Sequence, residues 1–326
     1  MACLGRSKAN LAIAFKFEKD GHVKAMQSFR VRGVAGFRAL ACLLVVLHHL
    51  IQRLDPDSTT LPRWLQGLHH FGMRGEVGVS IFFVLSGCLL SLPFWQAFIA
   101  AKPTPSLKRY SSNRLARIVP AYYLLLIVSA ILGVLVFQSP IDWATLLASL
   151  FFVNNFHYTS FFPSEIDTPL WSIGLEVWCY ILLPVAILTI VRRVRSVRTA
   201  AISLFVIILG LQALNPFLIS LLMTDHIRKG WQFGLIGGAK EWFPYWNLGT
   251  FFSQFLLGSA AALFICARAQ KSPTSHAAGD IVGVAALVTA FVLICVRLKP
   301  GNPDSVTHQP YLAPIFASLI ALSIAA

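Results

Sequence analysis

A histidine and a glutamate, His49 and Glu176, lie inside two otherwise apolar segments of this sequence. Histidine is the usual general base of enzymes, and a carboxylate can hold its ring in one tautomer and stabilise its cation. If both segments are membrane helices, the two side chains lie about 8 to 9 Å below the same membrane surface. The sequence therefore predicts that His49 and Glu176 meet and can transfer a proton.

Both residues also have a structural interpretation. A membrane histidine can be a buried hydrogen-bonding residue, and a membrane glutamate can pair with an arginine. The neighbouring His48 points about 100° away from His49 on a helix, and for His48 the structural interpretation is favoured. Arg38 precedes His49 by eleven residues, so the two share one helix face and lie about 16 Å apart along the axis.

Two arginines three residues apart, Arg114 and Arg117, lie on one helix face at the start of another apolar segment. Guanidinium groups match phosphate oxygens in a bidentate geometry, so this pair could clamp the phosphates of an anionic donor that arrives from the cytoplasm. Alternatively, both arginines anchor the helix among lipid headgroups. The sequence leaves both interpretations open.

Small residues punctuate the segment that follows His49, namely Gly72, Gly75, Gly78 and Gly87, with Ser86 beside the last of them. Small side chains allow membrane helices to approach closely, and close packing is the interpretation favoured here. A nucleophilic role for Ser86 is disfavoured, because no general base is predicted within hydrogen-bonding distance of it.

The composition shows what kind of elements must position these residues. Of the 326 residues, 56% are hydrophobic and only 12% are charged. This balance excludes a water-soluble globule, which carries about twice that share of charge, and also a disordered chain. The six cysteines form no CxxC pattern, so neither a disulfide framework nor a metal site is predicted.

The apolar blocks predict an all-α fold, a polytopic bundle of about eight transmembrane helices. The expected spans lie near Val34–Leu54, Val77–Phe98, Ile118–Phe137, Leu170–Val191, Ala200–Met223, Tyr245–Ala267, Gly279–Arg297 and Tyr311–Ala326. One further apolar segment, Trp143–Phe156, has only about 14 residues and is expected to be re-entrant or interfacial.

The basic residues are distributed unevenly between the predicted loops. With the N-terminus in the cytoplasm and Trp143–Phe156 not spanning, most of the 27 Lys and Arg residues fall on the cytoplasmic side. Residues 1–33 are then a basic cytoplasmic segment, with no apolar run long enough for a secretory signal. Because the positive-inside pattern accounts for the basic excess, nucleic acid is not an expected partner.

Four sequence blocks resemble the membrane-bound acyltransferase 3 family, and they occur in the family's order. RGVAGFRALACLLVVLHH (residues 32–49) is similar to the signature in which an arginine and a histidine are separated by ten residues. The other three blocks are GEVGVSIFFVLSGCLLS (75–91), NRLARIVPAYY (113–123), which carries the RxxR motif, and LWSIGLEVWCYILLPV (170–185).

The resemblance implies transfer of an acyl group, most often acetyl from acetyl-CoA, to a hydroxyl of a carbohydrate, a glycolipid or a similar acceptor. It implies that His49 is the catalytic histidine, that Arg38 supports the site, and that Arg114 and Arg117 face the acyl-CoA donor. Glu176 matches the first glutamate of the family's fourth block. Family members have about ten helices, so an integral membrane domain at residues 34–326 would lack the last two.

Two other function classes remain open at this point. A proton-coupled transporter or exporter could use His49 and Glu176 as a proton relay, and it would move substrate without forming an acylated product. A lipid- or partner-binding membrane scaffold would tolerate replacement of both residues. By family resemblance, the expected location of this multi-pass protein is the bacterial plasma membrane, with membrane lipid, acyl-CoA and a hydroxylated carbohydrate or lipid-linked acceptor as its partners.

Overall fold

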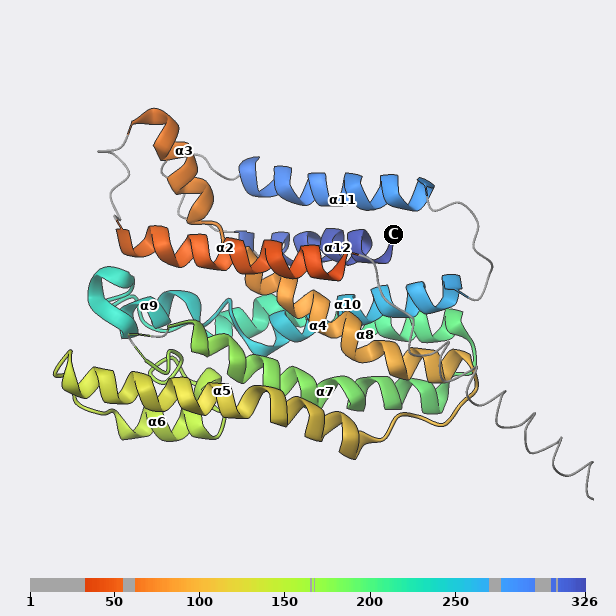
Figure 1. Cartoon of the computed structure of the whole chain (residues 1–326), viewed down its shortest axis with the longest axis horizontal. Helices are drawn as coiled ribbons and strands as arrows, with labels where there is room; N and C mark the ends of the chain where they lie inside the picture. The colour runs from red at the N-terminus through yellow and green to blue at the C-terminus, as the bar shows by residue number, and fades with distance from the viewer. Residues whose placement is uncertain are drawn as a thin grey trace, which may run out of the picture. The chain divides into compact units, whose positions relative to one another are not determined.

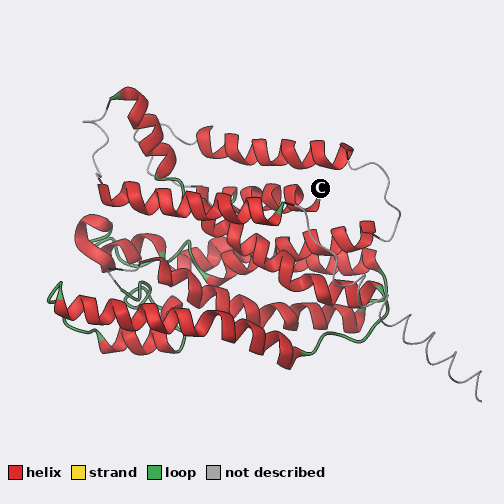
Figure 2. Ribbon diagram, in the orientation of Figure 1, coloured by secondary structure: helices red, strands yellow, loops and turns green. Residues whose placement is uncertain are grey.

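The computed structural model describes residues 33–54, 62–164, 166, 168–269, 277–296, 306–308 and 310–326. Within these ranges the regular elements are all helices, as Figures 1 and 2 show, and the prediction of an all-α fold is confirmed. The predicted cytoplasmic segment, residues 1–33, lies outside the described residues except for Gly33.

Seven helices of the described part are long and apolar enough to cross a membrane. They are α2 (Val34–Leu54), α4 (Val77–Ile99), α5 (Leu107–Leu135), α7 (Trp171–Arg193), α8 (Val197–Leu222), α10 (Leu248–Ala269) and α11 (Ala277–Val296). The eighth predicted span corresponds to α12 (Leu312–Ala325), which is shorter than these seven.

Three short helices and four turns of 3-10 helix connect the long helices. The short helices are α3 (Arg63–Gly72), α6 (Trp143–Leu150) and α9 (Gly234–Trp242), and the turns are Asn154–Phe156, Thr168–Leu170, Trp231–Phe233 and Val306–His308. Because α6 has only 8 residues, it cannot span a bilayer. This agrees with the expectation of a re-entrant or interfacial segment there.

The centre of the bundle is the pair α4 and α10, whose backbones touch at glycines. A Cβ on Gly87 would overlap the carbonyl of Phe255, and a Cβ on Gly258 would overlap the carbonyl of Val84. The indole Nε1 of Trp95 on α4 donates a hydrogen bond of 2.9 Å to a serine hydroxyl of α10. The prediction that Gly87 serves close helix packing is therefore supported.

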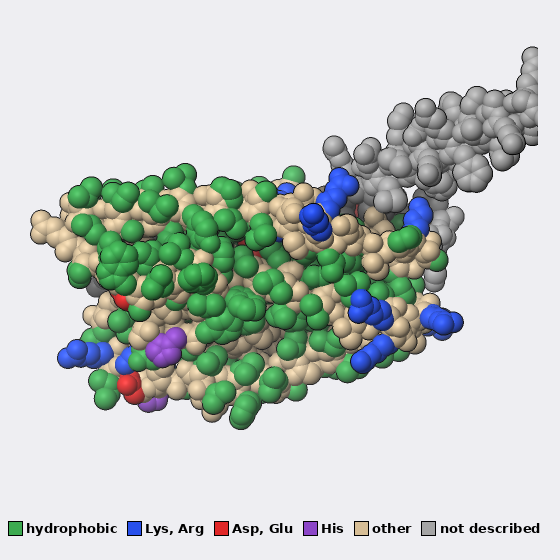
Figure 3. Space-filling view, turned by 90° about the horizontal axis from the view of Figure 1, so that it is seen from below, with side chains coloured by type: hydrophobic (Ala, Val, Ile, Leu, Met, Phe, Trp, Pro, Cys, Tyr) green, Lys and Arg blue, Asp and Glu red, His purple; other side chains and the backbone are tan. Residues whose placement is uncertain are grey.

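The peripheral helices expose large apolar side chains, as a lipid-facing surface requires. Leu43 and Val46 on α2 are 67% and 62% exposed, and Leu124 on α5 is 63% exposed. Figure 3 shows hydrophobic side chains over the middle of one face, with Lys and Arg gathered mostly at one end. This is the distribution that the positive-inside rule predicts for a membrane protein.

Helix α5 starts at Leu107, eleven residues before the predicted Ile118, and the prediction of that boundary is wrong. The Ser106 side chain accepts a hydrogen bond from the backbone of Arg109 and caps the helix. Lys and Arg are good helix formers, so the basic stretch continues the helix beyond its apolar part. As a result, Arg114 and Arg117 lie inside a long helix and not at its beginning.

Candidate active site

Helix α2 carries two adjacent histidines in different surroundings. His48 is buried, and its Nδ1 lies 3.0 Å from the carbonyl oxygen of Met73. Because a carbonyl only accepts hydrogen bonds, this contact places the ring proton on Nδ1. His49 is half-buried, and its ring lies edge-on to that of His48 with centroids 5.1 Å apart. The structural interpretation of His48 fits this geometry, and His49 is the more accessible of the two.

A carboxylate that sequence reasoning missed stands beside this pair. Glu76 is 4% exposed, and its Oε2 lies 3.7 Å from Nδ1 of His48. Two glycines, Gly75 and Gly78, bring this part of the chain onto α2, because a Cβ on either would overlap the carbonyl of Leu44 or Ala41. The spacing of small residues around Glu76 was the signal that could have located it against α2.

Glu176 lies in a separate cluster in the middle of the bundle. It accepts a hydrogen bond of 3.2 Å from the hydroxyl of Ser86 on α4, and another from the hydroxyl of Tyr180 one turn further along α7. Glu176 therefore joins α4 to α7. Arg117 and Arg114 on α5 lie near enough for their positive charges to act on it.

The predicted meeting of His49 and Glu176 is not found. Ser86 follows Glu76 by ten residues on the same helix, so Glu176 lies about 15 Å deeper in the bundle than the carboxylate beside His48. The prediction assumed that α7 begins at the membrane surface. Instead its first residue, Trp171, is buried and stacks on Trp246 at 4.3 Å, so α7 begins inside the bundle.

One of the two predicted donor-binding arginines lies beside a cavity of about 350 Å³ between α5 and α7. Arg114 lines this cavity, and its Nε is buried without a hydrogen-bond partner among the described residues. Tyr110 and Tyr180 form part of the wall and are connected, because the hydroxyl of Tyr110 donates to the carbonyl of Tyr180 at 3.1 Å. Arg117 is exposed one turn further along α5.

We call the space between α5 and α7 the donor cavity. Its lining combines one guanidinium group, which can bind an anion, with mostly apolar side chains. A buried guanidinium nitrogen without a partner fits a phosphate oxygen, and the remaining wall is largely apolar, with residues such as Ile118 and Pro184. Such a cavity suits an anionic ligand that carries an organic arm.

The structure leaves Arg38 apart from the two histidines. Arg38 is exposed near the start of α2, and helix geometry separates it from His49 by about 16 Å. Tyr180 was missed, although its spacing of four residues from Glu176 on one helix could have indicated it. Ser86 was judged to lack a base nearby, and no local signal in the sequence marks its contact with Glu176, 90 positions away.

The fold and these clusters define an all-helical membrane protein with a histidine pair at one level and an arginine-lined cavity at another. The acyltransferase domain that characterises the acyltransferase 3 family matches residues 31–325, and the chain belongs to this family. The resemblance noted for residues 32–185 is thereby confirmed and extends over nearly the whole chain.

Similar proteins carry names in agreement with this family. A peptidoglycan O-acetyltransferase of Listeria monocytogenes is 30% identical over 216 residues, which are 61% of this chain and 30% of the relative. A putative peptidoglycan O-acetyltransferase of Bacillus subtilis is 29% identical over 191 residues, which are 54% of this chain and 27% of the relative. The chain thus spans less than a third of the length of these relatives. No solved structure matches it.

Proposed function

We propose that this protein is an O-acyltransferase of the plasma membrane that moves an acetyl group from acetyl-CoA to a hydroxyl of a cell-envelope carbohydrate. The observation that carries the proposal is the family match over residues 31–325, which includes His49, Arg114, Arg117 and Glu176. The names of the relatives support acetyl as the acyl group and peptidoglycan or a similar glycan as the acceptor.

In this proposal the donor's phosphates bind at Arg114 and Arg117, and its thioester arm extends into the bundle. The half-buried His49 removes the proton of the acceptor hydroxyl, whose oxygen forms the new ester bond while the carbon–sulfur bond breaks. The histidine then gives that proton to the departing thiolate. Glu176 balances the charge of the two arginines, and Arg38 supports the entrance to the site at the start of α2.

The basic loops support an orientation with the N-terminus and the arginine end of the donor cavity in the cytoplasm. Acetyl-CoA is made in the cytoplasm, so this orientation brings the donor to Arg114 and the acceptor to the His49 end. An accessibility test on cysteine variants checks it. In the variant Arg109→Cys, the new thiol should react with a membrane-impermeant maleimide only after the cells are opened.

Purified protein in lipid nanodiscs tests the reaction itself. Labelled acetyl-CoA is added with a pool of hydroxylated acceptors, including peptidoglycan fragments, and products are identified by mass spectrometry. An acetyl ester that forms with the wild type and not with His49→Ala is the expected result. Proton-coupled flux of an acceptor without any ester would instead indicate a transporter, and full activity of His49→Ala would overturn the assignment of the base.

A further inference from the structure

A second cavity, larger than the donor cavity, lies at the other end of α5. Its volume is about 590 Å³, and it is enclosed by the end of α5, by α6, by the segment that follows α6, and by α9. Oxygen-bearing side chains from three of these elements line it: Ser129, Ser139, Asp142, Thr145, Thr159 and Ser164. We call it the outer cavity.

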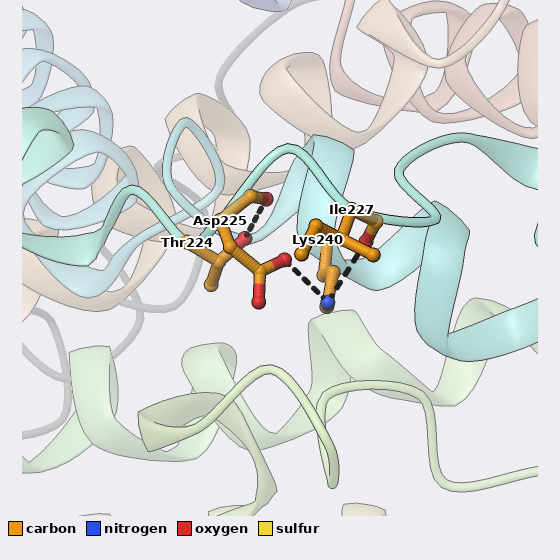
Figure 4. A network of polar contacts seen from close by, with 4 residues as sticks. All are labelled: Thr224, Asp225, Ile227 and Lys240. Atoms are coloured by element: carbon orange, nitrogen blue, oxygen red, sulfur yellow. Dashed lines mark hydrogen bonds and ion pairs between the residues drawn. The ribbon is translucent and has the colours of Figure 1, made fainter.

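The polar lining of the outer cavity is anionic or neutral. Among the lining residues that the structure describes, none is Lys, Arg or His, and Asp142 is the one with a charged side chain. Lys240 of α9 has its own partners, because its Nζ donates to Asp225 at 2.6 Å and to the carbonyl of Ile227 at 3.0 Å, as Figure 4 shows. A hydroxyl-rich neutral group fits this lining, and a phosphate does not.

An apolar groove lies beside the outer cavity along α5 and α6. Its volume is about 480 Å³, and every described residue that lines it is apolar. The groove shares four lining residues with the outer cavity, namely Leu126, Ala130, Ile141 and Leu146, so the two spaces are direct neighbours. Its outer rim is formed by Ile131 and Leu135, which are 51% and 74% exposed on a membrane helix.

This arrangement matches one molecule with two different ends. A hydrocarbon chain can enter the groove directly from the lipid phase, since both surroundings are apolar and the chain is not exposed to water on the way. A sugar attached to that chain then reaches the outer cavity and its hydroxyl groups. The carboxylate of Asp142 caps α6, where it accepts from the backbone of Ala144 and from the hydroxyl of Thr145, and its remaining lone pairs can accept from the sugar. The groove is lined by apolar residues, and the neighbouring cavity carries the oxygen-bearing side chains.

We propose that the outer cavity and the groove bind a glycolipid, with its chain between α5 and α6 and its uncharged sugar beside Asp142 and Thr145. That this glycolipid is the acceptor of the acyl group rests on the proposed function, whereas the binding does not. Helix α5 then carries the donor cavity at one end and the acceptor's site at the other, with the buried Tyr122 between them.

Gly133 offers a variant that fills the outer cavity without disturbing the fold. It lies in the cavity wall, and a Cβ there meets no atom within 4 Å. Leucine is also a better helix former than glycine, so Gly133→Leu should leave α5 intact. Gly210 of α8 has the same open surroundings and does not line the cavity, so Gly210→Leu is the matched control.

The probe is a dodecyl glucoside with a diazirine in its chain, added to phosphatidylcholine nanodiscs that contain the full chain. After irradiation, mass spectrometry is expected to find the label on α5 and α6 in the wild type and in Gly210→Leu, with a reduction of at least about fivefold in Gly133→Leu. Excess dodecyl glucoside should compete with the probe, and dodecyl phosphate should not. Equal labelling of Gly133→Leu, or equal competition by the phosphate, would overturn the proposal.

Activity is measured separately, so the two proposals fail in different ways. If the glucoside labels α5 and α6 but is never acetylated, the binding site stands and the proposed acceptor does not. If Gly133→Leu acetylates a glycolipid as fast as Gly210→Leu does, the acceptor of the reaction binds elsewhere.

Discussion

The hydroxyl of Ser86 donates a hydrogen bond of 3.2 Å to the carboxylate of Glu176, which joins α4 to α7 in the middle of the bundle. This contact places Glu176 beside a residue ten positions along the chain from Glu76, and therefore away from the histidines of α2. The charged groups of the site thus form two clusters, and single substitutions in each should affect different steps of the reaction.

Replacement of His49 by alanine should lower the rate of acetyl transfer by at least about two orders of magnitude, because general base catalysis contributes about 10²–10⁴-fold. Expression and thermal stability in detergent should not change, since His49 is only half-buried. The rate is measured with labelled acetyl-CoA.

His48→Ala is the companion variant, and it should show the reverse pattern. It removes the hydrogen bond to Met73 and should lower the free energy of unfolding by about 1 kcal/mol or more. A loss of activity at His48 that is as large as the loss at His49, with unchanged stability, would mean that the two roles are exchanged.

Replacement of Arg114 by glutamine should raise the KM for acetyl-CoA about tenfold or more, since a hydrogen bond to a charged group contributes about 1.5–3 kcal/mol. Arg117→Gln should have a smaller effect, because Arg117 is exposed and does not line the donor cavity. Arg109→Gln removes the same charge from an exposed position of the same helix and is the control. If all three variants raise KM equally, the arginines act as headgroup anchors.

Glu176→Gln distinguishes the two roles considered for this residue. The amide oxygen can still accept hydrogen bonds from Ser86 and Tyr180, so the cluster should stay intact. Loss of a negative charge near the donor's phosphates should lower the KM for acetyl-CoA about two- to tenfold. A large fall in kcat at unchanged KM would show instead that Glu176 assists the base.

Gly87→Ala should destabilise the protein, because the added Cβ would overlap the carbonyl of Phe255 on α10. Backbone atoms cannot move aside as a flexible side chain can, so we expect a loss of about 1–3 kcal/mol or more. Gly210→Ala, with open space around it, is the control and should not lower the melting temperature. Equal melting temperatures for both variants would contradict the close contact of α4 and α10.

The ion pair between Asp225 and Lys240 predicts a pH dependence of the loop between α8 and α9. The hydrogen bond from Lys240 lowers the pKa of the Asp225 carboxyl. A group whose pKa is lowered on folding stabilises the fold above its unfolded pKa, about 3.9, and this contribution disappears as the pH falls through the folded value. The loop should therefore be equally stable at pH 5 and pH 8 and weaken only below about pH 4.

Asp225→Asn imitates the acidic state at neutral pH. Tryptic cleavage after Arg228 or Lys229 should become faster, by no more than about fivefold because the Asp225 side chain is 56% exposed to solvent. Cleavage after Arg193, at the end of α7, serves as an internal control and should not change. A variant cleaved at the wild-type rate would show that the ion pair does not hold this loop.

The membrane helices could be predicted well because the signal is local. Apolar windows of about 20 residues located α2 with its observed bounds, Val34–Leu54, and placed α4 within one residue. The start of α5 was predicted too late in the sequence, because a helix can begin before its apolar part does. Basic residues continue the hydrogen-bonded backbone into the headgroup region.

The sequence predicts candidate site residues, but their grouping in space could not be predicted. The depth of Glu176 depends on the stacking of Trp171 on Trp246, two residues far apart in sequence whose contact no local pattern encodes. The position of Glu76 beside His48 likewise depends on the close approach of α2 and α4. Periodicity gives the face of a helix, whereas helix depth comes from packing between distant segments.

Glu76 and Ser86 both belong to the α4 region, which its glycines clamp onto α10. The interval of about 15 Å between the two clusters is therefore a fixed dimension of the molecule. In the proposed function, a donor bound at Arg114 has to span that interval for its acyl group to reach His49. The protein would then use thioesters with a long carrier arm as donors. Short acetyl donors such as acetyl phosphate would not react, however reactive they are in solution.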